Sequence, residues 1–337
     1  MPINIAINGL GRIGRAAFKI ALDMKDCQIV ALNDPMDPKT IAHLLSHDTV
    51  YQRFEKKVEA GQNAVIVDGK SYPIFAEKDP KNLPWKKLGV GVVLECTGIF
   101  TDKKKASWHL DAGAKKVIIS APAKDDITQT LVFGTEITQE VIKKHLSDNI
   151  ISNGSCTTNC IAPVIQILQN AFGIEKAVMT TVHSYTADQN LVDGPHKDLR
   201  RARAAAQNMV PTSTGAAKTT TKVVGGLDNL FDGISIRVPT PCVSISDITC
   251  VLKINVTTEE VNNAFIKASK TSLYKNILAV SHDKCVSSDF IKSPYSSVVD
   301  TEFTRVVGGN LVKVLAWYDN EWAYSLRLVE MAIAVGK

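Results

Sequence analysis

The sequence predicts an α/β protein of two domains: a doubly wound sheet first, then an α+β domain with a mainly antiparallel sheet. Three observations predict this. Short apolar runs alternate with helical patterns from Ile3 to Ser152, as expected of βαβ units. From Gly233 onward the strand patterns are separated by turn signals instead. The length of 337 residues also exceeds what one hydrophobic core usually holds.

Composition narrows the class of protein. Apolar residues make up 45% of the chain and charged residues 22%, as in ordinary globular enzymes, and no apolar run approaches the length of a membrane span. The N-terminus lacks the basic and apolar segments of a signal peptide. Seven cysteines without scaffold spacing favour a reducing compartment, so we expect a cytoplasmic protein. The net charge of +5 suits anionic small substrates and permits weak nucleic-acid contact.

The first predicted strand, Ile3 to Asn8, leads into a glycine motif and a helical run from Ala16 to Met24. The motif is G-x-G-x-x-G, with Gly9, Gly11 and Gly14, in the strand–turn–helix context of a dinucleotide site. Gly9 allows the tight turn, Gly11 lets backbone N–H groups approach a pyrophosphate, and Gly14 lets helix and strand pack closely. The spacing therefore predicts a Rossmann-type cofactor site.

The second predicted strand, Gln28 to Asn33, ends at Asp34. This carboxylate follows Gly14 by twenty residues, where an acidic side chain binds the ribose 2′-hydroxyl of NAD and repels the 2′-phosphate of NADP. The alternative is a glycine turn with an unrelated surface aspartate. Because motif, order and spacing agree, we favour an NAD site.

The remainder of the first half continues the alternation. A helix is expected over 40–47, a hairpin around Asp68-Gly69, and a helix over 102–110. Further strands are expected over 90–96, 115–120, 131–134 and 149–152. Gly98 and Ser120 follow two of these strands, at the carboxyl edge where ligands bind.

Cys156 lies where a short apolar run passes into a helical pattern. Asn153 and Ser155 are N-cap candidates, so Cys156 is expected in the first helical turn, where the helix dipole lowers the pKa of a thiol. Such a thiolate is a nucleophile. The alternative is a buried cysteine beside a helix cap. Cys160 is four residues further on, but no second Cys/His pair completes a zinc set, so we expect no metal site.

A candidate base follows in the second half. His183 comes after an expected strand over 177–181, and it is either a satisfied structural histidine or the partner of Cys156. The polar segment 187–203 ends in an arginine cluster and is long enough to be functional, although such clusters are often only solvated. Hydroxyls and a glycine over 211–217 precede a helix and suit an oxyanion.

The last expected elements are strands over 233–238, 243–254 and 311–318 and an amphipathic helix over 320–334.

Taken together, these segments resemble the phosphorylating, NAD-dependent glyceraldehyde-3-phosphate dehydrogenase family over essentially the whole chain. The matching segments occur in the family's order: Asn8-Gly9-Leu10-Gly11-Arg12-Ile13-Gly14-Arg15, Ser155-Cys156-Thr157-Thr158-Asn159-Cys160, His183-Ser184-Tyr185-Thr186, His196-Lys197-Asp198-Leu199-Arg200-Arg201, Thr212-Ser213-Thr214-Gly215, Arg237-Val238-Pro239-Thr240-Pro241 and Trp317-Tyr318-Asp319-Asn320-Glu321-Trp322.

The resemblance implies a mechanism. Cys156 attacks the aldehyde carbon of glyceraldehyde 3-phosphate to form a thiohemiacetal, assisted by His183, and hydride transfer to NAD leaves a thioester that inorganic phosphate cleaves. The residues implied to bind the cofactor are Gly9, Gly11, Arg12, Ile13, Gly14, Asp34, Lys78, Ser120 and Asn320. The residues implied to bind the two phosphates are Thr186 and Arg237 for the substrate, and Ser155, Thr157, Arg201, Thr214 and Gly215 for the attacking phosphate.

The resemblance also implies the domains and the assembly. Residues 1–154 would form the NAD-binding domain, with the helix 321–337 returning to it, and 155–320 the catalytic domain. Pro195 matches NAD-using members, and the loop that contains it implies a homotetramer. Gly154, Ala187, Cys242 and Ala323 depart from the commonest pattern, and Ala323 would matter if its backbone needed a positive φ. Two alternatives stay open: a dehydrogenase of erythrose 4-phosphate and a binding protein on the same fold.

Overall fold

The computed structural model describes residues 1–144 and 146–337. The chain divides into two compact units. The first unit comprises 1–131, 141–154 and 325–337, and the second comprises 132–140 and 155–324. The sequence placed 132–140 in the first domain. They belong to the second unit because Val132 is part of its core and the Glu136 amide donates to Gln166 Oε1 at 3.3 Å.

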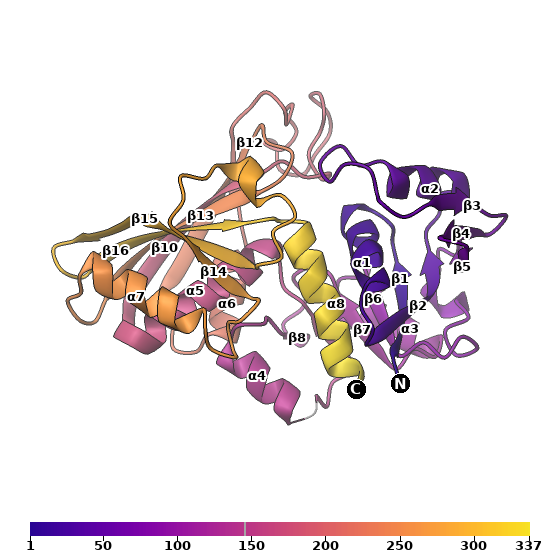
Figure 1. Ribbon diagram of the computed structural model, residues 1–337, viewed down its shortest axis with the longest axis horizontal. Helices are drawn as coiled ribbons and strands as arrows, with labels where there is room; N and C mark the ends of the chain where they lie inside the picture. Colours follow the sequence, from indigo (N-terminus) through magenta and orange to yellow (C-terminus); the bar gives the residue numbers. More distant parts are fainter. Residues whose placement is uncertain (145) are drawn as a thin grey trace. The chain divides into compact units, whose positions relative to one another are not determined.

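The first unit is built on a nine-stranded sheet in the order β3-β4-β5-β2-β1-β6-β7-β9-β8 (Figure 1). In chain order its strands are β1 (Ile3–Asn8), β2 (Cys27–Asn33), β3 (Val58–Ala60), β4 (Ala64–Val67), β5 (Lys70–Phe75), β6 (Val92–Glu95), β7 (Lys116–Ile119), β8 (Gln129–Thr130) and β9 (Ile150–Ser152). Seven of them, from β5 to β8 in this order, pair in parallel. The chain leaves β1 toward β2 and later returns to its other side as β6, so the strand order reverses at β1, where doubly wound sheets bind ligands.

The helices of this unit are α1 (Arg12–Leu22), α2 (Pro38–Ser46), α3 (Lys103–Asp111) and the greater part of α8 (Trp322–Gly336). Local sequence explains where two of them begin. The Asp37 carboxylate accepts from the amides of Lys39 and Thr40, with a proline at the first helical position. Asp102 accepts from the Lys105 amide in the same way.

The second unit has a seven-stranded sheet in the order β11-β12-β10-β13-β16-β15-β14. Its strands are β10 (Ile174–Ser184), β11 (Val210–Ser213), β12 (Phe231–Val238), β13 (Ser244–Leu252), β14 (Leu278–Ser281), β15 (Ser297–Val307) and β16 (Leu311–Tyr318). Its helices are α4 (Glu136–Lys143), of which residues up to 140 belong here, α5 (Cys156–Phe172), α6 (Ala216–Val223) and α7 (Thr258–Ala268). Four of the six strand pairs are antiparallel, which confirms the predicted fold class.

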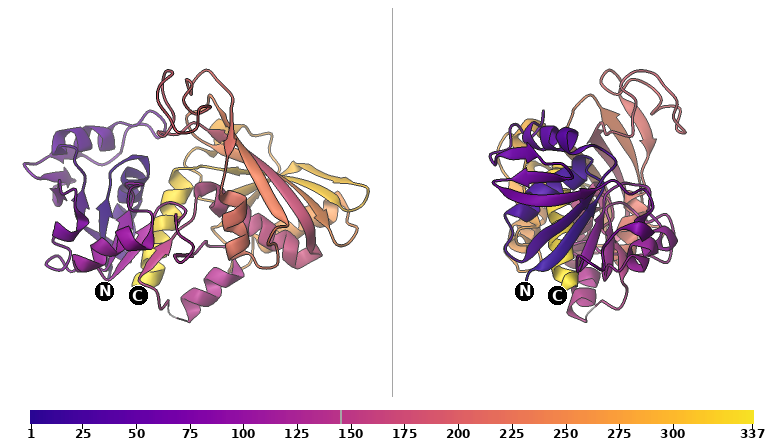
Figure 2. Two further views of the ribbon diagram at one scale, coloured as in Figure 1. Left: turned by 180° about the vertical axis from the view of Figure 1, so that it is seen from behind. Right: turned by 90° about the vertical axis from the view of Figure 1, so that its right-hand side faces the viewer.

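One face of this sheet is covered and the other carries exposed apolar side chains. Figure 1 shows α5, α6 and α7 on the same side, and Figure 2 shows the arrangement from behind. Along β10 the side chains of Ala177 and Met179 join the core, while Val178 between them is 61% exposed. Ile234 of β12 is 51% exposed in the same way. The alternation follows from the two-residue period of a strand.

Most predicted elements are present within a few residues, and three predictions need correction. The expected strand over 131–134 is wrong: β8 ends at Thr130, and a turn closed by Thr135 Oγ1 donating to the Val132 carbonyl follows. Strand β12 pairs with β10 in parallel rather than antiparallel. His183 lies inside β10, because that strand runs to Ser184. The elements β3, α4, β11, α7, β14 and β15 were not predicted. Within the described residues, every helix falls short of the length and apolarity that a membrane crossing requires.

Candidate active site

The first turn of α5 carries Cys156. Ser155 is the N-cap, and its hydroxyl accepts from the Thr158 amide at 3.0 Å. Gly154 has φ +63°, a conformation that favours glycine, so a glycine suits this turn. These local signals place the Cys156 thiol at the amino end of a 17-residue helix, as predicted.

His183 of β10 faces the thiol. Its Nε2 lies 3.5 Å from Cys156 Sγ. Its Nδ1 lies 2.7 Å from the Ser184 carbonyl, which can only accept, and 3.1 Å from Arg237 NH1, which can only donate. The shorter contact, to the carbonyl, favours the tautomer with the proton on Nδ1, which leaves Nε2 free to exchange a proton with sulfur. His183 is 3% exposed. The structure therefore brings together the thiol and the imidazole that the sequence predicted as nucleophile and base.

Burial controls the charge of this pair. Cys156 is half-buried, and its partial loss of water raises the pKa of the thiol, although the positive charge of Arg237 and N–H groups at the helix start lower it in part. Burial, and secondarily Arg237, lower the pKa of His183 to about 3. The sequence predicted a lowered thiol pKa. In this conformation desolvation outweighs the helix start, and the uncharged thiol–imidazole pair is favoured.

Cys160 provides the contrast on the same helix. It is fully buried, and its sulfur contacts Ser297 Oγ and the Ala316 carbonyl at 3.7 Å. Burial raises the pKa of its thiol to about 12. Cys160 therefore has the environment of an unreactive core cysteine, which is the alternative that the sequence left open for Cys156.

A cationic site lies beside the pair. The parallel register places Arg237 of β12 next to His183, and its NH1 donates to Thr186 Oγ1 at 3.1 Å. Asp188 accepts from the Thr186 hydroxyl and, at 2.6 Å, from Arg201 NH1. Burial would raise the pKa of Asp188, but the Thr186 hydrogen bond and the two arginine charges outweigh it and lower the pKa. Sequence reasoning missed Asp188, whose only signal was its place two residues after Thr186.

Arg201 is held in position by a second set of contacts. Its Nε donates to Thr212 Oγ1 at 3.0 Å, and the Thr212 hydroxyl donates to Asp198 Oδ2 at 2.5 Å. Nearby in the chain, Thr214 Oγ1 accepts from the Ala216 amide at 3.2 Å, and Gly215 is the N-cap of α6 with no side chain over it. A guanidinium, a hydroxyl and a helix start are the donors that phosphate prefers.

The hydroxyl of Thr157 points into the protein. It lies 2.9 Å from the Tyr318 hydroxyl, which in turn lies 2.8 Å from Thr181 Oγ1. Thr157 is 4% exposed and Tyr318 is 1% exposed. The Tyr318 ring also meets the His183 ring edge-on, with 5.9 Å between centroids. Tyr318 of β16 thus connects α5 and β10, the elements that carry Cys156 and His183. Sequence reasoning missed this role because it noted only the motif that contains Tyr318.

Asn320 is oriented by two serines. Its Oδ1 accepts from Ser184 Oγ at 2.9 Å and Ser244 Oγ at 3.4 Å, which leaves its NH2 group as a donor. The preceding Asp319 accepts from the amides of Glu321 and Trp322 at the start of α8, so this turn caps the helix. Ala323 lies within α8, and its φ is not positive.

The glycine motif lies at the carboxyl end of β1. Gly9 has φ +95°, and a Cβ there would come within 2.8 Å of the Cys96 carbonyl carbon. A Cβ on Gly14 would lie 1.9 Å from the Gly9 carbonyl oxygen, so only glycine fits. Gly11, the N-cap of α1, has open space where a side chain would be. These conditions match the three roles predicted for a dinucleotide site and fit the NAD pyrophosphate.

Asp34 follows β2 and is joined to the glycine loop. Its Oδ2 accepts from the Leu10 amide at 2.6 Å and its Oδ1 from the Met36 amide at 2.9 Å. Ser120 follows β7, and its amide donates to the Glu95 carbonyl at 3.0 Å, at the same edge of the sheet. Lys78 is exposed. The guanidinium of Arg12 is bound to Asp48 at 2.6 Å, so Arg12 and Ile13 offer their backbone at the start of α1.

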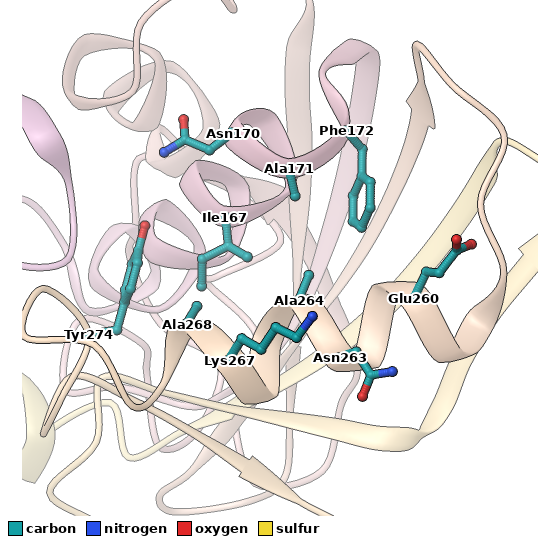
Figure 3. A pocket seen from close by; sticks show the side chains of 10 residues that line it. All are labelled: Ile167, Asn170, Ala171, Phe172, Glu260, Asn263, Ala264, Lys267, Ala268 and Tyr274. Atoms are coloured by element: carbon teal, nitrogen blue, oxygen red, sulfur yellow. The ribbon is translucent and has the colours of Figure 1, made fainter.

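A separate cavity of about 510 Å³ lies between α5 and α7 (Figure 3). Its floor is apolar, with Ile167, Ala171 and Phe172 toward α7. These residues are eleven or more positions after Cys156, about 16 Å along the helix. Neither Cys156 nor His183 lines it. Among the described residues there is also no group of three histidine, cysteine, aspartate or glutamate side chains that could hold a metal ion.

Comparison with known proteins adds independent findings. Residues 3–103 match the family model "Glyceraldehyde 3-phosphate dehydrogenase, NAD binding domain", and residues 155–320 match the model of its C-terminal domain. The chain is 47% identical to glyceraldehyde-3-phosphate dehydrogenase 2 of Bacillus subtilis, over 98% of this chain and 96% of that protein. It is 49% identical to glyceraldehyde-3-phosphate dehydrogenase of Geobacillus stearothermophilus and 50% identical to that of Borreliella burgdorferi, in each case over 98% of both chains.

Proposed function

The chain belongs to the glyceraldehyde-3-phosphate dehydrogenase family, and from this premise we propose which of its residues carry out the reaction. The protein is an NAD-dependent oxidoreductase of glycolysis that converts glyceraldehyde 3-phosphate and inorganic phosphate to 1,3-bisphosphoglycerate. The observation that supports our assignment is the 3.5 Å approach of Cys156 Sγ to His183 Nε2, beside Arg237 and Thr186.

We assign the covalent chemistry to Cys156 and His183. As sulfur attacks the aldehyde carbon, Nε2 accepts the thiol proton and passes it to the developing oxyanion, which gives a thiohemiacetal. NAD, when bound, supplies the acceptor for the hydride. Nε2 takes back the hydroxyl proton as the C–H bond breaks, and a thioester on Cys156 remains. Phosphate oxygen then attacks the thioester carbon, the C–S bond breaks, and the thiolate leaves beside the protonated His183.

The surrounding side chains are assigned to the two phosphate groups. Arg237 and Thr186 are proposed for the substrate phosphate, because Arg237 NH1 donates to Thr186 Oγ1 at 3.1 Å and the guanidinium and the hydroxyl therefore lie side by side. The attacking phosphate is assigned to Arg201, with Ser155, Thr157, Thr214 and Gly215. Thr157 would contribute its backbone at the start of α5, since its hydroxyl is bonded to Tyr318. The Arg201 guanidinium donates to the Asp188 carboxylate in this structure. We expect this hydrogen bond to break when an anion binds to Arg201.

The cofactor residues are assigned from the first unit and from Asn320. The N–H groups around Gly9, Gly11, Arg12, Ile13 and Gly14 would bind the pyrophosphate, and Asp34 the adenosine ribose. Lys78 would flank the adenine, and Ser120 would lie along the cofactor. The free NH2 group of Asn320 is suited to the nicotinamide carboxamide oxygen. We propose that the first unit, which includes the C-terminal residues 325–337, is the cofactor domain and that the second unit is the catalytic domain, in a cytoplasmic protein.

One assay tests the assignment. NADH formation from glyceraldehyde 3-phosphate is measured at 340 nm (the NADH absorbance band) with and without phosphate, on wild type and Cys156→Ser. We expect phosphate-dependent NADH formation by the wild type and none by the variant. Parallel reactions with NADP or erythrose 4-phosphate test cofactor and substrate choice. Phosphate-independent turnover, or full activity of Cys156→Ser, would refute the mechanism.

We also propose that the chain forms a homotetramer. Support comes from the uncovered face of the second unit's sheet, where Val178 and Ile234 are more than half exposed, and from Leu191, Val192 and Leu199 of the 185–209 loop, each at least 73% exposed. Large apolar side chains exposed on a sheet face and along a loop are typical of a subunit interface. Light scattering after size-exclusion chromatography is expected to give the tetramer mass, and Ile234→Lys a smaller species. A wild-type monomer would contradict the proposal.

A further inference from the structure

A row of buried polar side chains runs beneath the cofactor edge of the first unit. It consists of Asn33 of β2, Asn8 of β1, Glu95 of β6, His109 of α3 and Trp85, and we call it the buried polar chain. Each of these residues is at most 4% exposed. None of them is among the residues assigned to NAD, and a buried charged or amide group is retained only where its hydrogen bonds are satisfied.

One end of the buried polar chain is fixed by main-chain groups. The Glu77 amide donates to Asn33 Oδ1, and Asn33 Nδ2 donates to the Glu77 carbonyl, both at 2.9 Å. Asn33 Nδ2 also donates to Asn8 Oδ1 at 2.6 Å. The Asn8 NH2 group must therefore face Glu95, and it donates to Oε2 at 2.6 Å.

The other end is fixed by an indole. Trp85 Nε1 can only donate, and it lies 3.0 Å from His109 Nδ1, which must accept. The ring proton of neutral His109 is consequently on Nε2, which donates to Glu95 Oε2 at 3.0 Å. The 3.4 Å separation between Asn8 Nδ2 and His109 Nε2 is the distance between two donors that meet at one oxygen.

Glu95 completes the set with its second oxygen. Oε1 accepts from the Thr97 amide at 2.8 Å and from the Thr97 hydroxyl. The carboxylate thus receives four hydrogen bonds, two on each oxygen, which satisfy its acceptor capacity in the protein interior. Loss of any one donor leaves charge uncompensated in the interior.

The same residues connect the segments that follow four strands. The Gly9 amide donates to the Asn33 carbonyl at 2.8 Å, and the Cys96 amide donates to the Asn8 carbonyl at 2.7 Å. The hydrogen bonds to Glu77 connect the buried polar chain to the segment that contains Lys78, and those to Thr97 connect it to the turn at Gly98. The glycine loop, the Asp34 turn, and the segments after β5 and β6 therefore share one hydrogen-bonded support.

We propose that Glu95 and His109 are positioning residues for NAD: they hold these four segments in their binding geometry before the cofactor arrives. A preordered site loses less conformational entropy on binding, so removing this support weakens affinity rather than chemistry. The inference rests on the cofactor residues assigned above. It extends that assignment to residues that need not touch the cofactor.

The test compares NAD affinity with stability in the full-length protein. The dissociation constant for NAD is measured by titration calorimetry, and the unfolding midpoint by thermal denaturation. His109→Phe removes both ring nitrogens and is expected to weaken NAD binding about tenfold. His109→Gln keeps an acceptor and a donor and is expected to recover most of the affinity. Val92→Ala, at the opposite end of β6 and fully buried, is the matched control: it should lower the unfolding midpoint and change NAD affinity less than about twofold.

A second readout separates positioning from general damage. The alkylation rate of Cys156, which lies in the other unit, is expected to stay at the wild-type value in His109→Phe. If His109→Phe does not fold, Trp85→Phe removes the indole donor alone and is expected to weaken NAD binding in the same direction. Unchanged NAD affinity in folded His109→Phe would overturn the inference. A loss of NAD affinity in Val92→Ala that accompanies its lower unfolding midpoint would overturn it too, because affinity would then depend only on stability. A wild type that binds no NAD would instead overturn the proposed function.

Discussion

Removing the Tyr318 hydroxyl tests whether the catalytic pair depends on the tertiary contacts behind it. Tyr318→Phe keeps the ring beside His183 but removes hydrogen bonds of 2.9 Å to Thr157 and 2.8 Å to Thr181. Thr181 retains a long contact of 3.5 Å to the Ile245 carbonyl, and the Thr157 hydroxyl retains only its interaction with the Cys156 thiol, a weak partner. Two buried neutral hydrogen bonds contribute about 1 kcal/mol each, and a poorly satisfied hydroxyl costs up to about 1 kcal/mol more. We therefore expect the free energy of unfolding to fall by about 2–3 kcal/mol.

The assay is urea unfolding followed by tryptophan fluorescence at one protein concentration, because assembly contributes to apparent stability. Tyr295→Phe is the control: it makes the same chemical change at a half-buried hydroxyl that has no hydrogen-bond partner among the described residues. It should change the free energy of unfolding by less than about 0.5 kcal/mol. The double variant Thr157→Val/Tyr318→Phe removes both partners of one hydrogen bond. Its loss in the free energy of unfolding should be at least about 1 kcal/mol smaller than the sum of the losses in the two single variants.

Tyr318→Phe should also slow catalysis, because the hydroxyl holds the start of α5 against β10, the two elements that carry Cys156 and His183. A kcat reduction of about threefold to tenfold corresponds to a loss of roughly 0.7–1.4 kcal/mol in transition-state stabilisation. Unchanged stability in Tyr318→Phe, or strict additivity in the double variant, would refute the reasoning.

Three further predictions follow from individual contacts. Arg237→Gln removes the charge that lowers the thiol pKa, so the midpoint of Cys156 alkylation against pH should move to higher pH; an unchanged midpoint or a shift to lower pH would show that the Arg237 charge does not stabilise the thiolate. Gly14→Ala places a methyl group 1.9 Å from a carbonyl oxygen and should cost about 3 kcal/mol or more, measured by urea unfolding, whereas Gly11→Ala should fold normally. Asp34→Asn removes the charge that repels a 2′-phosphate, so kcat/KM for NADP relative to NAD should rise about tenfold or more; an unchanged ratio would remove Asp34 from cofactor choice.

Much of the site could be predicted because its signals are local in the chain. Gly9 and Gly14 are required by one turn and the helix that follows it, and their spacing is visible in the sequence. Ser155 and Cys156 belong to one helix cap, whose geometry depends on adjacent residues. Asp34 follows a short strand directly. The doubly wound sheet could be predicted for the same reason, since alternating strands and helices are a local pattern.

Elements with weaker local patterns were misplaced or missed. The apolar residues at 131–134 look like a strand, but Val132 is buried in the second unit's core and Gly134 takes φ +82°. The parallel pairing of β12 with β10 depends on the chain's return path, which short-range patterns do not contain. Yet this pairing is what places Arg237 beside His183.

The sequence by itself determined the residue types of the chemistry and the turns that present them, because turn, cap and strand preferences act over a few residues. Only the tertiary structure decided which partner each side chain has. Thr157 bonds to Tyr318 across 161 positions, and Asn8 bonds to Glu95 across 87. Likewise, the local helix start favours a Cys156 thiolate, but packing removes water from the thiol and raises its pKa. Desolvation and buried hydrogen bonds depend on every segment that closes over a group, so they arise only when the whole chain has folded.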